Sequence, residues 1–188
     1  IQWTDCSHRS FAQTQGFVGK QTLSFTKTAM NAQLPGQDPT LADEELEAGA
    51  PACVLSFNAN DPTGASGIGA DIATIAAMGA HALPVITSIL VRDTAEIFES
   101  HEIDPEAVAD QARSVLEDTT IASWKVGFLG SAEGVSAVAE ILSDYTDVPL
   151  VSYLPNLSWM DDDAQMAYLD AFRELILPTN TKIGRAHV

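Results

Sequence analysis

The segment SFNANDPTGASGIGADI, residues 56–72, places a glycine-rich turn directly between an apolar run and a stretch with helical spacing. Gly64 and Gly67 permit positive φ and let a ligand approach the backbone. The N–H groups that open the following helix can hold a polar or anionic group. The segment matches neither G-x-G-x-x-G nor G-x-x-x-x-G-K-[ST]. By itself it predicts either a ligand site beyond the carboxyl end of a first strand or a merely tight strand-to-helix turn.

Outward from this segment, apolar runs alternate with helical patterns. The runs at residues 53–57, 83–91, 123–128 and 149–154 suit strands that are buried on both faces of a parallel sheet. The helical patterns that follow them have apolar positions at Ile68, Ile72, Ile75 and Ala76; Val108, Ala112, Val115 and Leu116; Val135, Val138, Ala139 and Leu142; and Met166, Leu169, Phe172 and Ile176. This alternation predicts an α/β fold with a doubly wound, mostly parallel sheet, right-handed crossovers and helices on both faces.

Capping residues predict the ends of three of these helices. Gly79 is placed to end the first helix, because glycine readily adopts the left-handed conformation found there. Asp104 and Pro105 suit the N-cap and first turn of the second helix. The aspartates at 161–163 lie at the favourable end of the dipole of the last helix. These signals set helix boundaries independently of the apolar periodicity.

The two ends of the chain differ in character from its centre. Residues 1–52 lack apolar periodicity and are rich in Gln, Thr and Ser, so we expect them to be disordered or non-native. Met30 is the first methionine; a native start there is one interpretation, and a targeting leader is the other. Residues 53–181 are expected to form the N-terminal part of the folded domain. Residues 182–188 are expected to be a non-native tail, with an ordinary polar tail as the alternative.

Composition and charge exclude several classes of partner. The chain has 188 residues, of which 46% are hydrophobic and 19% charged, and a formal net charge of −17. A field of this sign argues against nucleic acid and against a membrane surface as partners. Two cysteines are too few for a disulfide framework, which predicts a reducing, cytoplasmic compartment. His81 and His101 are isolated from other ligand residues, so no metal site is predicted from protein side chains.

The glycine-rich segment resembles the opening A-G-S-D-P-S-G-G-A-G-I-Q-A-D of the hydroxymethylpyrimidine/phosphomethylpyrimidine kinases. M-G-A-H-A-L-P-V-I-T at 78–87 is similar to the family's L-G-A-Y-G-x-S-V-I-T, and W-K-V-G-F-L-G at 124–130 to its V-K-I-G-M-L. The resemblance covers residues 53–178. It implies a ribokinase-like fold, a three-layer α/β/α arrangement that is incomplete at the C-terminus. It also implies ATP and Mg²⁺ as cofactors and a small-molecule pyrimidine as substrate.

The resemblance implies a substrate site built mainly by the first strand-to-helix turn. Asp71 matches a family residue at the pyrimidine site, and Ala59 and Ser66 replace a glycine and an alanine that line it. Phe128 replaces the family's methionine, and Gly127 matches the glycine beside that methionine. The full set of expected substrate-binding residues is Ala59, Asp61, Gly64, Ser66, Gly67, Asp71, Arg92, Gly127 and Phe128.

Departures from the family pattern bear on the substrate. Arg92 stands where the family has a Gln or Glu that hydrogen-bonds the aminopyrimidine, and a guanidinium has five donors but no acceptor. It suits a phosphate or carboxylate better, and we expect it to point inward and pair with Asp71. The family's D-P-V-M is replaced by S-Y-L-P-N at 152–156, which has no acid to lie near the cation and phosphates. Lys125 is either a ligand contact or a strand-end surface lysine.

Three functions are compatible with these patterns. The first is an ATP-dependent kinase that phosphorylates hydroxymethylpyrimidine or its monophosphate in thiamine biosynthesis, with this chain carrying mainly the substrate-binding half. The second is a non-catalytic ribokinase-like ligand-binding domain, and the third a related pyridoxine-type kinase. The family's G-T-G-C-type catalytic segment is expected beyond the C-terminus of this chain, which should therefore bind but not turn over. A homodimer is one of the oligomeric states left open.

Overall fold

The run at the start of the glycine-rich segment becomes the central strand of a six-stranded sheet. The computed structural model describes residues 50–179 and 182–185. Its strands in spatial order are β3 (Ile97–Glu102), β2 (His81–Arg92), β1 (Cys53–Asn60), β4 (Ser123–Val126), β5 (Leu150–Leu154) and β6 (Lys182–Arg185). All neighbours pair in parallel except β2 and β3, which are antiparallel. The mostly parallel sheet predicted from the alternating pattern is therefore confirmed.

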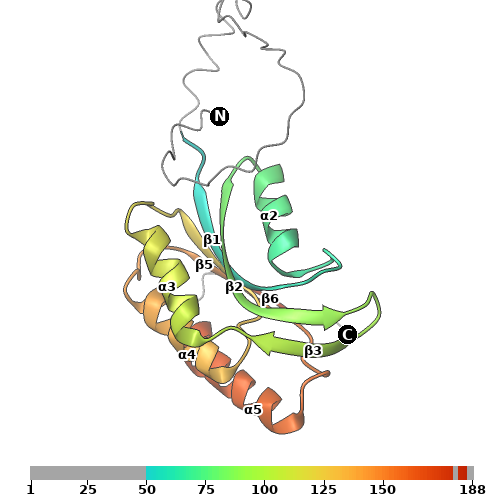
Figure 1. The fold of residues 1–188 in the computed structure, drawn as a ribbon. Coiled ribbons are helices and arrows are strands. Elements are labelled where there is room, and N and C mark those ends of the chain that lie inside the picture. The colour runs from blue at the N-terminus through green and yellow to red at the C-terminus, as the bar shows by residue number, and fades with distance from the viewer. Residues whose placement is uncertain (1–49, 180–181, 186–188) are drawn as a thin grey trace, which may run out of the picture. The chain divides into compact units, whose positions relative to one another are not determined.

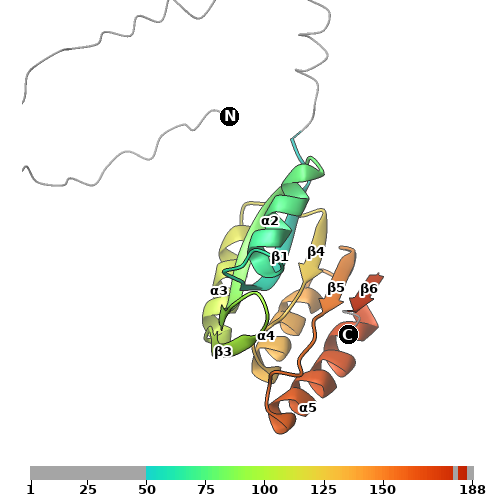
Figure 2. The ribbon, with the colours of Figure 1, turned by 90° about the vertical axis from the view of Figure 1, so that its right-hand side faces the viewer.

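Helices cover both faces of the sheet, as expected for the three-layer arrangement. They are α2 (Gly67–Ala77), α3 (Pro105–Leu116), α4 (Ala132–Ser143) and α5 (Asp162–Ala171), and α5 continues into a π-helical turn (Phe172–Ile176) and a 3₁₀ turn (Leu177–Thr179). Figures 1 and 2 show α2 on one face and α3, α4 and α5 side by side on the other. Right-handed crossovers require this division, because the chain moves from β1 to β2 in one direction and from β4 to β5 in the opposite direction.

The predicted caps are present. The Asp104 carboxylate accepts the N–H of Glu106, and the Asp161 carboxylate accepts the N–H of Ala164. Gly79 follows α2 with a φ of +79°, in the left-handed region that favours glycine. Local sequence therefore fixes where these three helices begin or end.

Side-chain alternation along β1 and β4 divides two environments. Leu55 and Phe57 on β1 are fully buried in the core with Trp124 on β4, whose ring stacks on Phe57. Ser56 and Lys125, which pair in register, point to the other face and reach α2. Because side chains alternate across a strand, the same short runs supply both the apolar core and the polar groups beneath α2.

Four positions of the predicted apolar patterns are exposed. Met166 and Leu169 were expected to be buried but are exposed, because α5 instead turns Tyr168 inward, in line with Phe172 one turn later. Ile72 and Ala76 on α2 are exposed as well, Ile72 by 40%.

The ends of the chain give a mixed outcome. Residues 182–185 pair with β5 as a strand, although they were expected to belong to a tail. Residues 1–49, which include the proposed start at Met30, lie outside the described residues, as do residues 186–188. Of the described helices, only α2 covers its face of the sheet (Figures 1 and 2). On that face of the sheet, the Val151 side chain of β5 is 43% exposed.

Candidate substrate site

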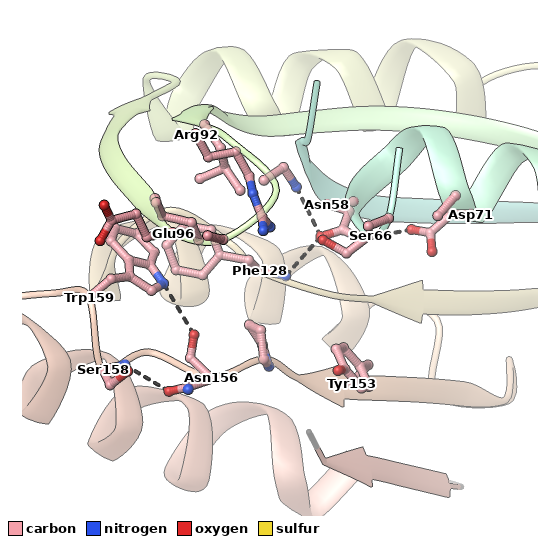
Figure 3. A pocket seen from close by; sticks show the side chains of 18 of the residues that line it. Asn58, Ser66, Asp71, Arg92, Glu96, Phe128, Tyr153, Asn156, Ser158 and Trp159 are labelled. Atoms are coloured by element: carbon pink, nitrogen blue, oxygen red, sulfur yellow. Dashed lines mark hydrogen bonds between the residues drawn. The ribbon is translucent and has the colours of Figure 1, made fainter. Parts of the chain in front are cut away.

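The sheet has its topological switch point between β1 and β4. The chain leaves β1 for β2 on one side, whereas β4 pairs on the other, so the carboxyl ends of β1 and β4 border a crevice. Open α/β sheets bind ligands in such crevices. A cavity of about 670 Å³ lies there, lined by the ends of β1 and β2, the start of α2, the β2–β3 hairpin, and residues that follow β4 and β5. Figure 3 shows its lining side chains.

Asp71, on the second turn of α2, collects three hydrogen bonds on a single carboxylate oxygen. Its Oδ2 accepts from Ser56 Oγ at 2.7 Å, Asn58 Nδ2 at 2.9 Å and Lys125 Nζ at 2.7 Å. Burial lowers the pKa of Lys125, and the hydrogen bond and charge of Asp71 partly offset that effect. The second oxygen, Oδ1, has no hydrogen bond within the part of the chain that the structure describes. Asp71 thus lines the cavity with a fixed carboxylate and one open acceptor.

Asn58 joins this cluster to the strand ends. Its Nδ2 donates to Asp71, while its Oδ1 accepts the N–H groups of Ala59 and Phe128, both at 3.0 Å. The Asn58 amide also occupies the space that a Cβ at position 127 would need, which accounts for Gly127. One buried amide therefore sets the spacing between the β1 and β4 ends where the cavity begins.

Asp61 organises the glycine-rich turn instead of lining the cavity. Its carboxylate accepts the N–H and hydroxyl of Thr63, the hydroxyl of Ser66 and Nη1 of Arg92. Burial acts to raise the pKa of Asp61, but the hydrogen bonds from Ser66 and Thr63 and the charge of Arg92 outweigh it, and the pKa lies below the ordinary value. Asp61 is therefore a buried anion that holds the turn and one arginine.

Gly67 is the position where this turn requires glycine. Its φ is +70°, and a Cβ there would lie 2.6 Å from the carbonyl oxygen of Ala59. Gly64 also has a φ of +70°, but nothing lies within 4 Å of a Cβ added to it. The close approach of the turn to the β1 end therefore depends on Gly67.

Arg92 points into the cavity from the end of β2. Its Nη1 contacts Asp61 at 3.2 Å and its Nε donates to the carbonyl of Asp93 at 2.9 Å. The expectation that Arg92 pairs with Asp71 was wrong: Lys125 holds Asp71, and Arg92 is held by Asp61. The side chain is 16% exposed, so the guanidinium is largely enclosed.

Aromatic residues form the apolar wall of the cavity. Phe128, just after β4, meets the Trp159 ring edge-to-face with centroids 5.5 Å apart, and Tyr168 supports it from behind at 5.4 Å. The Tyr168 hydroxyl accepts the N–H of Leu129, and burial raises the pKa of this phenol. Trp159 both packs against Phe128 and lines the cavity.

Six of the nine residues predicted to bind substrate line the cavity: Ala59, Ser66, Gly67, Asp71, Arg92 and Phe128. Asp61, Gly64 and Gly127 do not line it. Lining residues that were not predicted from the sequence include Asn58, Glu96, Tyr153, Asn156 and Trp159. Asn58 lies within the segment that decided the fold, so its polar side chain in a buried run was an available signal. The others come from loops or strand ends, whose contribution depends on how the layers pack.

The described residues do not fit a metal held by protein ligands. No group of three or more His, Cys, Asp or Glu residues within residues 50–179 and 182–185 could hold an ion. The cavity-lining residues after β5, which are Pro155, Asn156, Ser158 and Trp159, include no acid, and the two acids that do line the cavity, Asp71 and Glu96, belong to α2 and to the β2–β3 hairpin. A Mg²⁺ ion is commonly bound by one or two carboxylates together with substrate phosphates. We therefore derive no chemical step through a metal.

None of the described helices is long and apolar enough to cross a membrane.

Comparison with known proteins bears directly on this site. The sequence profile described as phosphomethylpyrimidine kinase matches residues 61–181. The chain belongs to this family. Its match to the family begins at Asp61, inside the glycine-rich turn, and includes all residues that line the cavity except Asn58 and Ala59, so the resemblance inferred from three motifs is confirmed.

Two curated relatives illustrate the family match. The hydroxymethylpyrimidine/phosphomethylpyrimidine kinase of Streptomyces coelicolor is 36% identical over 133 residues, which cover 70% of this chain and 49% of that protein. The enzyme of the same name from Escherichia coli is 38% identical over 91 residues, 48% of this chain and 34% of that protein. The chain therefore spans about half of the first relative and about a third of the second.

Solved structures share the fold at lower identity. A phosphomethylpyrimidine kinase from Clostridium difficile gives a TM-score of 0.65 at 23% identity, covering 71% of this chain and 59% of that one. A pyridoxal kinase from Bacillus subtilis, solved as an ADP complex, gives 0.63 at 19% identity, covering 71% and 51%. These similarities confirm the ribokinase-like architecture of the described part of this phosphomethylpyrimidine kinase family member.

Proposed function

We propose that this protein is an ATP- and Mg²⁺-dependent kinase that phosphorylates hydroxymethylpyrimidine or its monophosphate in thiamine biosynthesis. In this proposal residues 53–181 carry mainly the acceptor-substrate site. The position of the cavity is the main support: it lies at the switch point, and residues of the family-like motifs at 56–72 and 124–130 line it. Family membership supports the same activity.

Within this proposal the cavity binds and orients the acceptor. Asp71 accepts a hydrogen bond from the ligand through the carboxylate oxygen that the described residues leave open. Phe128 and Trp159 provide apolar surfaces against which a flat ring can pack. N–H groups at the start of α2 face the polar end of the ligand. Enclosing the acceptor in this way supplies the positioning on which phosphoryl transfer depends.

The nucleotide and the cation remain proposals from the family. ATP would supply the transferred phosphoryl group, and Mg²⁺ would neutralise charge on the phosphates. We assign no residue of the described chain to either.

Calorimetric titration of hydroxymethylpyrimidine into the whole chain tests the site. The wild type should bind, and Asp71→Asn should bind at least about tenfold more weakly, about 1.4 kcal/mol. Asp110→Asn, an exposed aspartate on α3, is the matched control and should bind like the wild type. Thermal unfolding shows whether each variant is folded. Failure of the folded wild type to bind any pyrimidine would contradict the proposed function.

A non-catalytic ligand-binding domain is the second candidate. The observation in its favour is the absence of an acidic residue among residues 155–159 and of a metal cluster in the described chain. Incubation of the full-length protein, catalytic segment included, with ATP, Mg²⁺ and hydroxymethylpyrimidine separates the two candidates, because only the kinase converts ATP to ADP in step with formation of phosphorylated pyrimidine. Including pyridoxal as an alternative acceptor tests the pyridoxine-type kinase in the same assay.

We also propose a cytoplasmic location, supported by the low cysteine content, and a homodimer as the oligomeric state. Size-exclusion chromatography with light scattering measures the second property directly. A mass of one chain would contradict the homodimer.

A further inference from the structure

Arg92 is held in place with much of its hydrogen-bonding capacity unused. A guanidinium carries five N–H donors. One N–H on Nη1 contacts Asp61 and the one on Nε contacts the Asp93 carbonyl. Within the described residues the other three N–H groups have no hydrogen-bond partner. Because Arg92 lines the cavity, these donors are available to a ligand there.

The anchor of Arg92 is itself fixed. The Asp61 side chain is fully buried, and it also accepts hydrogen bonds from Thr63 and Ser66. Figure 3 shows the Arg92 guanidinium directed to the side of the cavity where Ser66 and Asn58 lie. An arginine that is already oriented loses little side-chain freedom when it binds a ligand. Asp61 therefore positions the charge of Arg92 and leaves one side of the guanidinium open.

The chemistry of this position favours an anion. The Arg92 guanidinium has three unused donors and no acceptor, so it cannot accept hydrogen bonds from a ring amino group. Its donors do match the oxygens of a phosphate. Two carboxylates also line the cavity. The charge of Asp71 is paired with Lys125, and Glu96 is exposed, so solvent and salt screen its repulsion. Arg92 is largely enclosed, and its attraction for an anion is screened less.

We propose that Arg92 is a specificity-determining residue that makes this cavity prefer an acceptor already carrying a phosphate. The inference rests on the proposed function, under which the preferred substrate is phosphomethylpyrimidine and not the neutral hydroxymethylpyrimidine. The reaction of this protein would then be the second phosphorylation, and its substrate must come from a reaction that phosphorylates the neutral alcohol.

Calorimetric titration of both pyrimidines into the whole chain, in buffer without phosphate, tests this preference. The wild type should bind the monophosphate at least about tenfold more tightly than the neutral alcohol. Arg92→Gln should weaken binding of the monophosphate by roughly 10- to 100-fold, since a charged hydrogen bond is lost. It should bind the alcohol at least as tightly as the wild type does, because a glutamine amide can also accept a hydrogen bond. Arg113→Gln, which removes an exposed arginine on α3, is the control and should change neither affinity.

Arg92→Lys provides a second variant in case Arg92→Gln fails to fold without a cationic partner for Asp61. Lysine keeps the charge but lacks the planar fork, so it cannot contact Asp61, Asp93 and a phosphate together. We expect a partial loss of affinity for the monophosphate alone.

The outcomes separate the inference from the proposed function. Equal wild-type affinity for the two pyrimidines, unchanged in the folded Arg92 variants, overturns the inference and leaves the proposed function standing. Binding of neither pyrimidine by folded wild type overturns both. Selective loss of monophosphate binding in the Arg92 variants supports both.

Discussion

The ammonium of Lys125 lies 2.7 Å from the Asp71 carboxylate, although the two residues are 54 positions apart in the chain. Both side chains are largely enclosed, with 19% and 14% of their surfaces exposed. Lys125 was predicted to be either a ligand contact or a surface lysine, and the structure makes it a cavity-lining partner of Asp71. This pair joins α2 to β4 and so fixes the wall of the candidate site.

Lys125→Met should destabilise the fold because it leaves the Asp71 charge without its cationic partner. We expect a loss of about 1–3 kcal/mol in the free energy of unfolding, measured by urea denaturation. Arg173→Met removes an exposed pair with Asp170 and should cost less than about 1 kcal/mol. Equal losses in the two variants would show that the Lys125 pair is no stronger than a surface pair.

Asn58→Asp should weaken both stability and ligand binding. The change keeps an oxygen that can accept the N–H groups of Ala59 and Phe128 but replaces the donor to Asp71 by a second carboxylate oxygen. We expect a loss of about 1–3 kcal/mol in urea denaturation. Asn156→Asp, on an exposed loop residue, keeps its acceptor for Ser158 and should have little effect on stability. A neutral Asn58→Asp would contradict the linking role of this amide.

Gly67→Ala should damage the fold more than Gly64→Ala. Both glycines have a φ of +70°, so both substitutions place a Cβ in the left-handed conformation, at about 1–2 kcal/mol each. The Cβ at position 67 would also overlap the carbonyl of Ala59 and the Cβ of Asp61, whereas that at 64 meets open space. Melting temperatures of the two variants, compared with wild type, provide the measurement. Similar values would mean that the turn can move away from β1.

Asp61 predicts a specific dependence of stability on pH. Its pKa in the folded state lies below the ordinary value of 3.8, so its ionised form stabilises the fold. That contribution is complete above pH 3.8 and decreases as the pH falls below this value, because protons then bind the unfolded state more readily.

Asp61→Asn tests this dependence. The variant should be less stable than wild type at pH 7 and should lose less additional stability between pH 5 and pH 3, as followed by melting temperature. Asp110→Asn, an exposed change of the same kind, should keep the wild-type slope. If the melting temperature of Asp61→Asn falls between pH 5 and pH 3 as much as that of the wild type, other carboxylates control the loss of stability in acid.

Much of the fold was predictable from local sequence. The apolar runs and helical spacings gave the strand and helix order, and Asp104, Asp161 and Gly79 placed helix ends correctly. Edge elements were harder to predict. β3 has no fully buried position and pairs antiparallel with β2, and residues 182–185 form β6 only by pairing with β5. Strands at an edge bury little apolar surface, so their sequence pattern is weak.

The sequence by itself determined the strand–turn–helix segment, the family, and six residues that line the cavity, because these depend on backbone preferences and on motifs contiguous in the chain. Only the tertiary structure decided the ion pairs. The pleat of β4 and the seating of α2 on the sheet bring Lys125 to Asp71, and the end of β2 brings Arg92 to Asp61 across 31 positions. Charged side chains choose partners by distance in space, and that distance is set by the packing of layers, not by sequence spacing.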